Sequence, residues 1–233
     1  MIVKVWVQNI RINLWYARVD GYSFIIFSHH MQTMEGGVIL TDNKDIDNFL
    51  KSLRAHGWCR DLPKKNNLYK KSNNNFKDNF VFITPGYCLR PLEIEASVGL
   101  VQLKRFNEFM NIRLKNYTTF KNLFENQNWC EIQKIDKNSS SSWFGFNLIL
   151  KGKLKNKRKK IIDILIKNQI EVRPTMTGNF LNNPVMKYLD YKAKGNFKNS
   201  NYIDKNGFFV GNYPKDITKE LKFLYKKIKE VLK

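Results

Sequence analysis

Two adjacent histidines, His29 and His30, are the residues of this sequence best suited to acid–base chemistry. They follow a short apolar run at 24–27 and precede the turn Glu35-Gly36-Gly37. An imidazole titrates near neutrality, so a histidine at the end of a strand can accept or donate a proton. Composition alone favours a simpler interpretation, in which the pair begins a polar loop. The segments that surround the pair decide between the two.

The overall composition is that of a globular protein with a strong excess of positive charge. Hydrophobic residues make up 42% of the 233 residues and aromatic residues 14%, which excludes a disordered chain. The formal net charge is +21, and such a balance raises nucleic acid or an anionic membrane as a partner. Because the basic residues are nearly all lysines and come with many Asn and Ile, we attribute most of this excess to a background bias. A functional basic patch is the alternative.

The cysteines and the apolar segments indicate a reduced, cytoplasmic protein. Cys59, Cys88 and Cys130 are far apart and odd in number, so they predict neither a zinc site nor a disulfide framework. The sequence contains no run of about 18 apolar residues, and segment 1–22 lacks the uninterrupted apolar core of a signal peptide. We therefore expect no membrane partner.

The hydrophobic pattern predicts an α/β fold with helices packed on a small sheet. Segment 61–80 is rich in Lys and Asn and predicts a long surface loop. Pro91 marks a helix start, with a second helical stretch at 104–125. The other expected elements are strands at 2–7, 24–27, 38–41, 143–150, 170–173 and 207–210, and helices at 46–53, 157–168 and 217–231.

Six segments in a fixed order resemble the DegT/DnrJ-type family of sugar aminotransferases and dehydratases. In that family a strand leads to a lysine, which binds pyridoxal phosphate, and then to a turn that ends in Glu/Gly-Gly. The stretch SHHMQTMEGG is similar to this element, but His29 stands at the place of the lysine. The other similar segments are LRAHGW (53–58), PGYCLRPLEIEASVGLVQL (85–103), SSWFGFNLIL (141–150), IEVRPTMTGNFLNNPVMKY (170–188) and GFFVGNYP (207–214).

The resemblance implies the C-terminal part of a pyridoxal-phosphate (PLP)-dependent transferase fold, of the aspartate aminotransferase type I. We expect an unmatched segment at 1–22, a remnant of the large cofactor domain with connecting helices at 23–125, and a small C-terminal α/β domain at 126–233. The N-terminal half of the family's chain has no counterpart here, so we expect a truncated chain.

A histidine in place of the lysine is typical of the family's dehydratase branch in lipopolysaccharide biosynthesis. The resemblance therefore implies 3-dehydration of a nucleotide-linked 4-keto-6-deoxy sugar. PLP or its amine form, pyridoxamine phosphate (PMP), would be held without a covalent bond. His29 is the expected catalytic base, and His30 is the alternative for that role.

The resemblance also implies residues that bind cofactor and substrate. Relatives have a serine near the cofactor phosphate; Ser23 lies one residue from that place. Relatives have an asparagine where this sequence has Cys88, and a thiol is a weaker donor. Arg90, Arg173 and Asn179 are the expected substrate-binding residues. Some dehydratases of this branch hold an iron–sulfur cluster, but three cysteines cannot supply four ligands, so we expect none.

Three alternatives remain open from the sequence. The first is a sugar aminotransferase of the same family, which the missing lysine disfavours. The second is an inactive remnant, or one half of a split enzyme that needs a separate N-terminal partner chain. The third is binding of nucleic acid or another anionic surface through the excess lysines; we do not expect nucleic acid as a partner. A homodimer is the other expected assembly, as in relatives.

Overall fold

The computed structural model describes residues 3–7, 10–14, 23–25, 33, 38–72 and 74–232. Its contacts divide the chain into two compact units, unit 1 (Met1–Arg105) and unit 2 (Phe106–Lys233). The division falls within the long helix α3 (Glu93–Phe124), so the helix contributes to both units. The expected domain boundary after residue 125 stays a prediction. No helix in the described ranges is long and apolar enough to cross a membrane.

Unit 1 begins with two short antiparallel strand pairs. The first joins β1 (Val3–Val7) to β2 (Ile10–Leu14), and the second joins β3 (Ser23–Ile25) to β4 (Val38–Leu40). β2 was not expected from the sequence. In the second pair, the backbone of Ser23 lies opposite that of Leu40. His29 and His30 come between β3 and β4 in the sequence, outside the described residues.

Helix α1 (Lys44–Leu53) follows β4 and begins at a side-chain cap. Asn43 is the cap: its Oδ1 accepts hydrogen bonds from the backbone N–H groups of Asp45 (2.9 Å) and Ile46 (3.3 Å). Asn is among the best residues at this position because it satisfies N–H groups that the helix leaves free.

Segment 61–80, which the sequence predicts as a surface loop, is organised around a buried carboxylate. It contains the short helix α2 (Asn75–Asp78), and Asp78 is only 4% exposed. One oxygen of Asp78 accepts hydrogen bonds from the N–H and hydroxyl of Ser72 and from the Tyr69 hydroxyl. The Cys59 thiol donates to the backbone carbonyl of Asp78 at 3.0 Å. Burial raises the pKa of that thiol, so Cys59 stays protonated and acts as a structural group.

Unit 2 is built on a four-stranded antiparallel sheet in the order β5-β6-β8-β7. Its strands are β5 (Cys130–Ile132), β6 (Gly145–Leu150), β8 (Gly207–Gly211) and β7 (Arg173–Pro174). Alternate residues of the central strand β6 are buried, as expected for a strand with one face on the core: Phe146, Leu148 and Leu150. β5 was not expected from the sequence, and β7 is shorter than expected.

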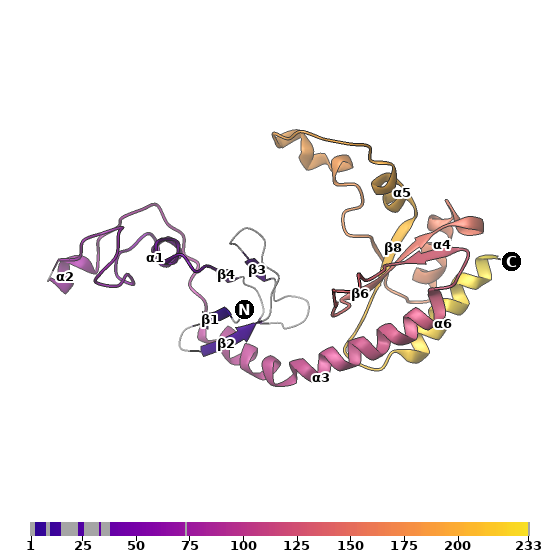
Figure 1. Ribbon diagram of the computed structural model, residues 1–233, viewed down its shortest axis with the longest axis horizontal. Helices are drawn as coiled ribbons and strands as arrows, with labels where there is room; N and C mark the ends of the chain where they lie inside the picture. Colours follow the sequence, from indigo (N-terminus) through magenta and orange to yellow (C-terminus); the bar gives the residue numbers. More distant parts are fainter. Residues whose placement is uncertain are drawn as a thin grey trace. The chain divides into compact units, whose positions relative to one another are not determined.

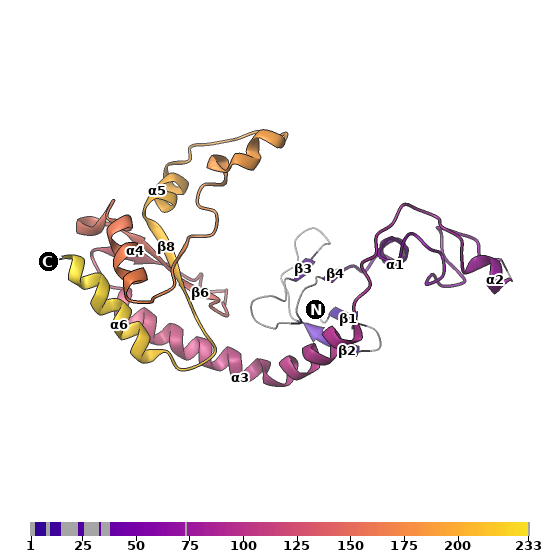
Figure 2. The same ribbon diagram turned by 180° about the vertical axis from the view of Figure 1, so that it is seen from behind.

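The helices of unit 2 complete its core (Figures 1 and 2). They are the second part of α3, α4 (Arg158–Lys167), α5 (Lys198–Asn206) and α6 (Thr218–Lys229), with 3-10 turns at Gly152–Leu154, Phe180–Asn182, Pro184–Tyr188 and Glu230–Leu232. The ring of Phe120 in α3 stacks on that of Phe146 in β6, with 4.4 Å between the ring centroids. The rings of Phe124 and Tyr225 in α6 make an edge-to-face contact, with 5.3 Å between their centroids. The helical stretches predicted after Pro91 form one helix because nothing between them breaks it; Gly99 is tolerated inside it.

Buried amides fix the loop between β8 and α6 against α3. Asn116 is 1% exposed and donates to the backbone carbonyls of Tyr213 and Lys215, at 3.1 and 2.7 Å. Its Oδ1 accepts from the backbone N–H of Ile217 at 3.3 Å. Asn212, 3% exposed, donates to a carbonyl of α3 and to one that precedes β6. Such fully used buried amides hold one particular arrangement of the chain.

Candidate functional site

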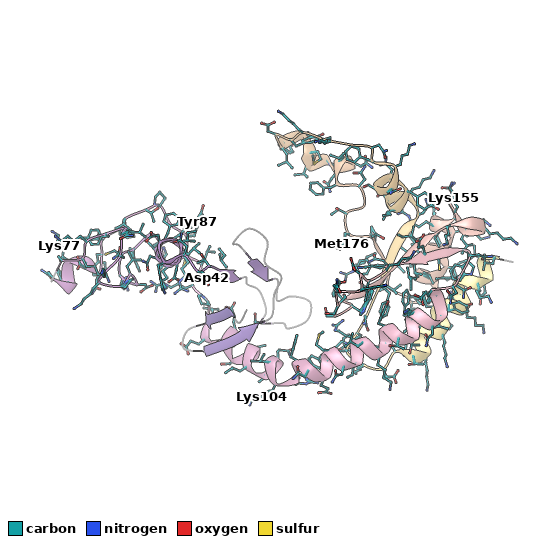
Figure 3. The ribbon with its side chains drawn as sticks, in the orientation of Figure 1. Asp42, Lys77, Tyr87, Lys104, Lys155 and Met176 are labelled. Atoms are coloured by element: carbon teal, nitrogen blue, oxygen red, sulfur yellow. The ribbon has the colours of Figure 1, made fainter. Side chains whose placement is uncertain are left out.

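The end of α1 is held against segment 81–89 by backbone hydrogen bonds. His56 N–H donates to the Tyr87 carbonyl at 2.9 Å, and Leu89 N–H donates to the Arg54 carbonyl at 2.9 Å. The two backbone segments approach so closely that a Cβ on Gly86 would lie 2.1 Å from the Gly57 nitrogen. Only glycine fits there. Tyr87, which belongs to segment 81–89, is labelled in Figure 3.

This pairing surrounds the Trp58 ring with cationic and aromatic side chains. The Arg60 guanidinium carbon lies 4.0 Å from the ring centroid, and that of Arg90 lies 5.4 Å from it. The rings of His56 and Phe82 lie 4.9 and 5.6 Å away. Arginine stacks well on an indole, because the ring face is electron-rich and the guanidinium is weakly hydrated. Backbone pairing thus brings Arg90 to a site that residues 54–60 build.

We call these side chains the Trp58 cluster: His56, Trp58, Arg60, Phe82 and Arg90. Its positive charges have no balancing carboxylate in the described part of the chain. Arg60 and Arg90 form no ion pair there. Three buried N–H groups also lack an acceptor, namely Arg54 Nε, Trp58 Nε1 and Arg60 Nε. A buried donor without a partner costs about 1–3 kcal/mol. An anion with several oxygens, such as a phosphate or diphosphate, would balance the charges of Arg60 and Arg90.

Two other candidate residues of unit 1 are described only in part or lie at the surface. Ser23 is in β3, and the structure describes its backbone alone. Cys88 is an exposed free thiol whose backbone pairs with that of Ala55. It lies two residues from Arg90, so the family-like segment 85–103 does reach the Trp58 cluster. A thiol is a weak hydrogen-bond donor, so Cys88 fits a phosphate less well than an asparagine.

The candidate residues of unit 2, Arg173 and Asn179, already have protein partners. Arg173 begins β7 and donates from Nε and an Nη atom to Glu171, at 2.9 and 2.7 Å. This ion pair is exposed and therefore weak, so it leaves Arg173 available to a ligand. Asn179 is 7% exposed; its Oδ1 accepts from Leu181 N–H and its Nδ2 donates to Asn201 at 2.7 Å. Its first role is to shape the loop between β7 and α5.

His29 and His30 lie outside the described residues, so their expected role in catalysis stays a prediction. Within the ranges that the structure describes, no three His, Cys, Asp or Glu side chains are placed to hold a metal ion.

Sequence reasoning missed Arg54, Trp58 and Arg60 as functional candidates. A signal was present, because the sequence has nine arginines against 32 lysines, and two of the nine, Arg60 and Arg90, lie over the Trp58 ring. Arginine stacks on aromatic rings and donates several hydrogen bonds from one plane, which lysine does not, so an arginine two residues from a tryptophan is a candidate for such a site.

Comparison with known proteins shows the family to which this chain belongs. The DegT/DnrJ/EryC1/StrS aminotransferase family model matches residues 16–229. GDP-4-keto-6-deoxy-D-mannose 3-dehydratase of Yersinia pseudotuberculosis is 43% identical over 206 residues, which are 88% of this chain and 52% of that protein. The enzyme of the same name from Escherichia coli O55:H7 is 43% identical over 209 residues, 89% of this chain and 52% of that protein. The chain thus spans about half the length of the curated relatives it matches.

Solved structures agree with the sequence comparison. An E. coli GDP-4-keto-6-deoxy-D-mannose 3-dehydratase with bound hydrated PLP superposes with a TM-score of 0.79 at 43% identity, over 88% of this chain and 52% of that one. A putative sugar aminotransferase from Streptococcus pneumoniae, at 20% identity, has a TM-score of 0.73 over 91% of this chain and 53% of that one, and shows the fold alone.

These findings confirm the predicted fold class, the C-terminal part of a PLP-dependent transferase fold with a small α/β domain. The predicted likeness to the dehydratase branch is confirmed by the 43% identity to 3-dehydratases. The chain belongs to the DegT/DnrJ/EryC1/StrS aminotransferase family and corresponds to the C-terminal portion of its relatives.

Proposed function

We propose that this chain supplies the C-terminal half of a PLP/PMP-dependent enzyme that removes the 3-hydroxyl of a 4-keto-6-deoxy nucleotide sugar, for lipopolysaccharide biosynthesis. The observation that carries the proposal is the 43% identity to two 3-dehydratases. The resemblance of SHHMQTMEGG to the family's cofactor element, with His29 expected where aminotransferases have lysine, supports it. A solved variant of one 3-dehydratase replaces a neighbouring serine and histidine, and this sequence has the same dipeptide at Ser28-His29.

His29 would move the proton in this reaction. Bound PMP supplies an amine and an electron-accepting ring. The imidazole of His29 can accept a proton at neutral pH and cannot form the stable covalent link that a lysine forms with PLP. His30 is the alternative base. A sugar aminotransferase is the second candidate activity, but the relatives that carry this name are only 20% identical or less in the solved structures compared.

The Trp58 cluster would bind the diphosphate of the nucleotide sugar. Its arginines have no carboxylate partner among the described residues, and its buried N–H groups lack acceptors. Arg173 and Asn179 stay proposed substrate-binding residues by their resemblance to the family, and Asn179 has one amide hydrogen that it does not use for Asn201. Ser23 and Cys88 would lie toward the cofactor phosphate.

The other half of the site would come from a polypeptide that corresponds to the N-terminal half of the relatives, with a homodimer as the alternative assembly. Support comes from the exposed apolar side chains of unit 1, which include Phe76, Phe80, Phe82, Leu89, Leu92 and Ile94. A surface with this many exposed apolar groups is typical of one that another protein covers.

An absorbance titration with PMP tests the proposal. The chain is titrated alone and after mixing with a separately produced N-terminal half of the Yersinia relative. We expect saturable binding in the mixture, weaker binding when Cys88→Ala removes a cofactor contact, and unchanged binding for His29→Asn, because the base acts on the bound cofactor. Absence of binding in the mixture would overturn the proposal and leave an inactive remnant as the explanation.

A further inference from the structure

The positive charge of the chain is concentrated in two segments of unit 2. Segment 151–167 has eight basic residues and one acidic residue, and segment 215–232 has six basic and three acidic residues. Together they carry a net charge of +10, about half of the chain's +21. In the structure these segments form α4, α6 and the turns beside them, and the two helices pack against each other. A background bias toward lysine does not by itself place the charge on neighbouring helices.

Each of the two helices carries its lysines on the side opposite its buried residues. In α4, exposed lysines lie opposite the buried Ile161 and Leu165, and in α6 they follow the helical spacing opposite Leu221, Leu224 and Ile228. We call these side chains, together with Lys157 at the N-cap of α4, the lysine face: Lys157, Lys159, Lys160 and Lys167 with Lys219, Lys222, Lys226 and Lys229. Lys155, labelled in Figure 3, lies next to this face in the sequence.

The lysines of this face form no close ion pairs. None of its eight side chains forms an ion pair with a carboxylate in the described ranges, although nearby Lys151 and Lys227 pair with Glu131 and Glu230. A shallow hollow of about 540 Å³ opens between the lysines of α4, with Asn156, Asp163 and Ile164 completing its lining. Like charges held this close repel one another, and a multivalent anion would relieve that repulsion.

We propose that the lysine face docks the protein on a membrane surface that contains anionic phospholipids. Lysine is a compact point charge on a flexible stem, which suits phosphate groups that have no fixed arrangement. Two apolar side chains project from the same helices, Ile166 (60% exposed) and Phe223 (42% exposed). A bilayer interface takes up apolar side chains between its headgroups, as amphipathic helices use it. The contact is peripheral, and it departs from the sequence-based expectation of no membrane partner.

The same features argue against nucleic acid as the occupant. Sequence-tolerant binding of single strands relies on several aromatic side chains on which successive bases stack. The exposed parts of α4 and α6 offer one such ring, Phe223, and Lys227 already lies over it at 5.4 Å. A duplex would use the charge but gain nothing from Ile166 and Phe223.

Vesicle co-sedimentation of the full chain tests the proposal. The probes are vesicles of phosphatidylcholine alone and of phosphatidylcholine mixed with phosphatidylglycerol, at low and high salt. We expect binding to the mixed vesicles only, weakened by salt. Each lysine near an anionic membrane strengthens partitioning on the order of fivefold. The triple variant Lys159→Glu, Lys160→Glu and Lys222→Glu should therefore lose binding by about 100-fold or more.

A matched variant separates the face from the overall charge. Lys64→Glu, Lys65→Glu and Lys70→Glu change the net charge equally at exposed positions of unit 1, which have no ion pair among the described residues. We expect this variant to bind almost as the parent does. Equal loss of binding in both triple variants would overturn the proposal, because the attraction would then come from net charge alone. Absence of binding to the mixed vesicles by the parent would overturn it as well.

Apolar variants distinguish a membrane from nucleic acid. Ile166→Ser with Phe223→Ser should weaken binding to mixed vesicles by about tenfold or more, because both side chains lose their place in the interface. The same variant should leave binding to an RNA duplex unchanged. An RNA affinity that exceeds the affinity for mixed vesicles, together with vesicle binding that this variant does not change, would assign the lysine face to nucleic acid. Circular dichroism checks that every variant keeps the parent's fold.

Discussion

The substitution Arg60→Gln tests whether the Trp58 cluster is an anion site. Arg60 lies 4.0 Å over the Trp58 ring, its Nε is buried without an acceptor, and no described carboxylate pairs with it. Hydrogen bonds to charged groups contribute about 1.5–3 kcal/mol. The substitution should therefore weaken the binding of inorganic pyrophosphate by roughly 10- to 150-fold. Lost stacking on Trp58 costs only about 0.5–1 kcal/mol of stability, so the fold is kept.

The assay is a fluorescence titration with pyrophosphate, which does not absorb where tryptophan does. Trp58→Phe identifies the part of the signal that comes from this ring. Lys64→Gln is the control, because it removes one positive charge from an exposed position of unit 1. Equal binding by the parent and Arg60→Gln, or equal weakening by Lys64→Gln, would refute the argument that these donors are arranged for an anion.

Further predictions concern the buried polar groups and the thiols. Asn116→Ala should lower the free energy of unfolding of unit 2 by roughly 2–4 kcal/mol, because it leaves buried backbone groups without partners. The control Asn147→Ala loses one exposed hydrogen bond and should lower it by less than about 1 kcal/mol. Chemical denaturation compares the two variants. Asp78→Ala should make segment 61–80 the first site of limited proteolysis, because the hydrogen bonds that organise it converge there; an unchanged first cleavage would count against this. Cys88 should react with a thiol reagent in the native state while Cys130 reacts only on unfolding, because burial raises the pKa of Cys130 to about 12. The folded chain therefore binds the thiol proton of Cys130 more tightly than the unfolded chain does. This contribution to stability is fully present below pH 9.0 and is lost as the pH rises toward about 12, and unfolding curves at increasing pH would show the loss.

Periodicity predicted the elements that carry a long apolar pattern. The closing helix was predicted at 217–231 and forms α6 at Thr218–Lys229, and the strand predicted at 143–150 forms β6 at Gly145–Leu150. Both bury a regular set of apolar side chains, so their own sequence determines them. The short strand β5 and the polar helix α5 were not predicted, because three residues and a segment rich in Asn and Lys carry too weak a periodic signal.

Tertiary contacts explain the remaining differences. Segment 61–80 is polar enough to predict a surface loop, but burial of Asp78 organises it, and no local pattern announces a buried carboxylate. The Trp58 cluster depends on backbone pairing between residues 54–59 and 81–89, which lie far apart in the sequence. The family resemblance supplied Arg90 as a candidate, whereas Trp58 and Arg60 emerged only when the structure brought them beside it.

We propose that this chain provides the base and part of the substrate site of a 3-dehydratase. The most direct test of this proposal is the mass of the product formed from GDP-4-keto-6-deoxy-D-mannose by the chain, PMP and the N-terminal half of the Yersinia relative. The account predicts a nucleotide sugar that has lost its 3-hydroxyl, with the reaction abolished by His29→Asn and retained by His30→Asn. A product that instead carries an amine, or an equal yield from His29→Asn and the parent, would contradict it.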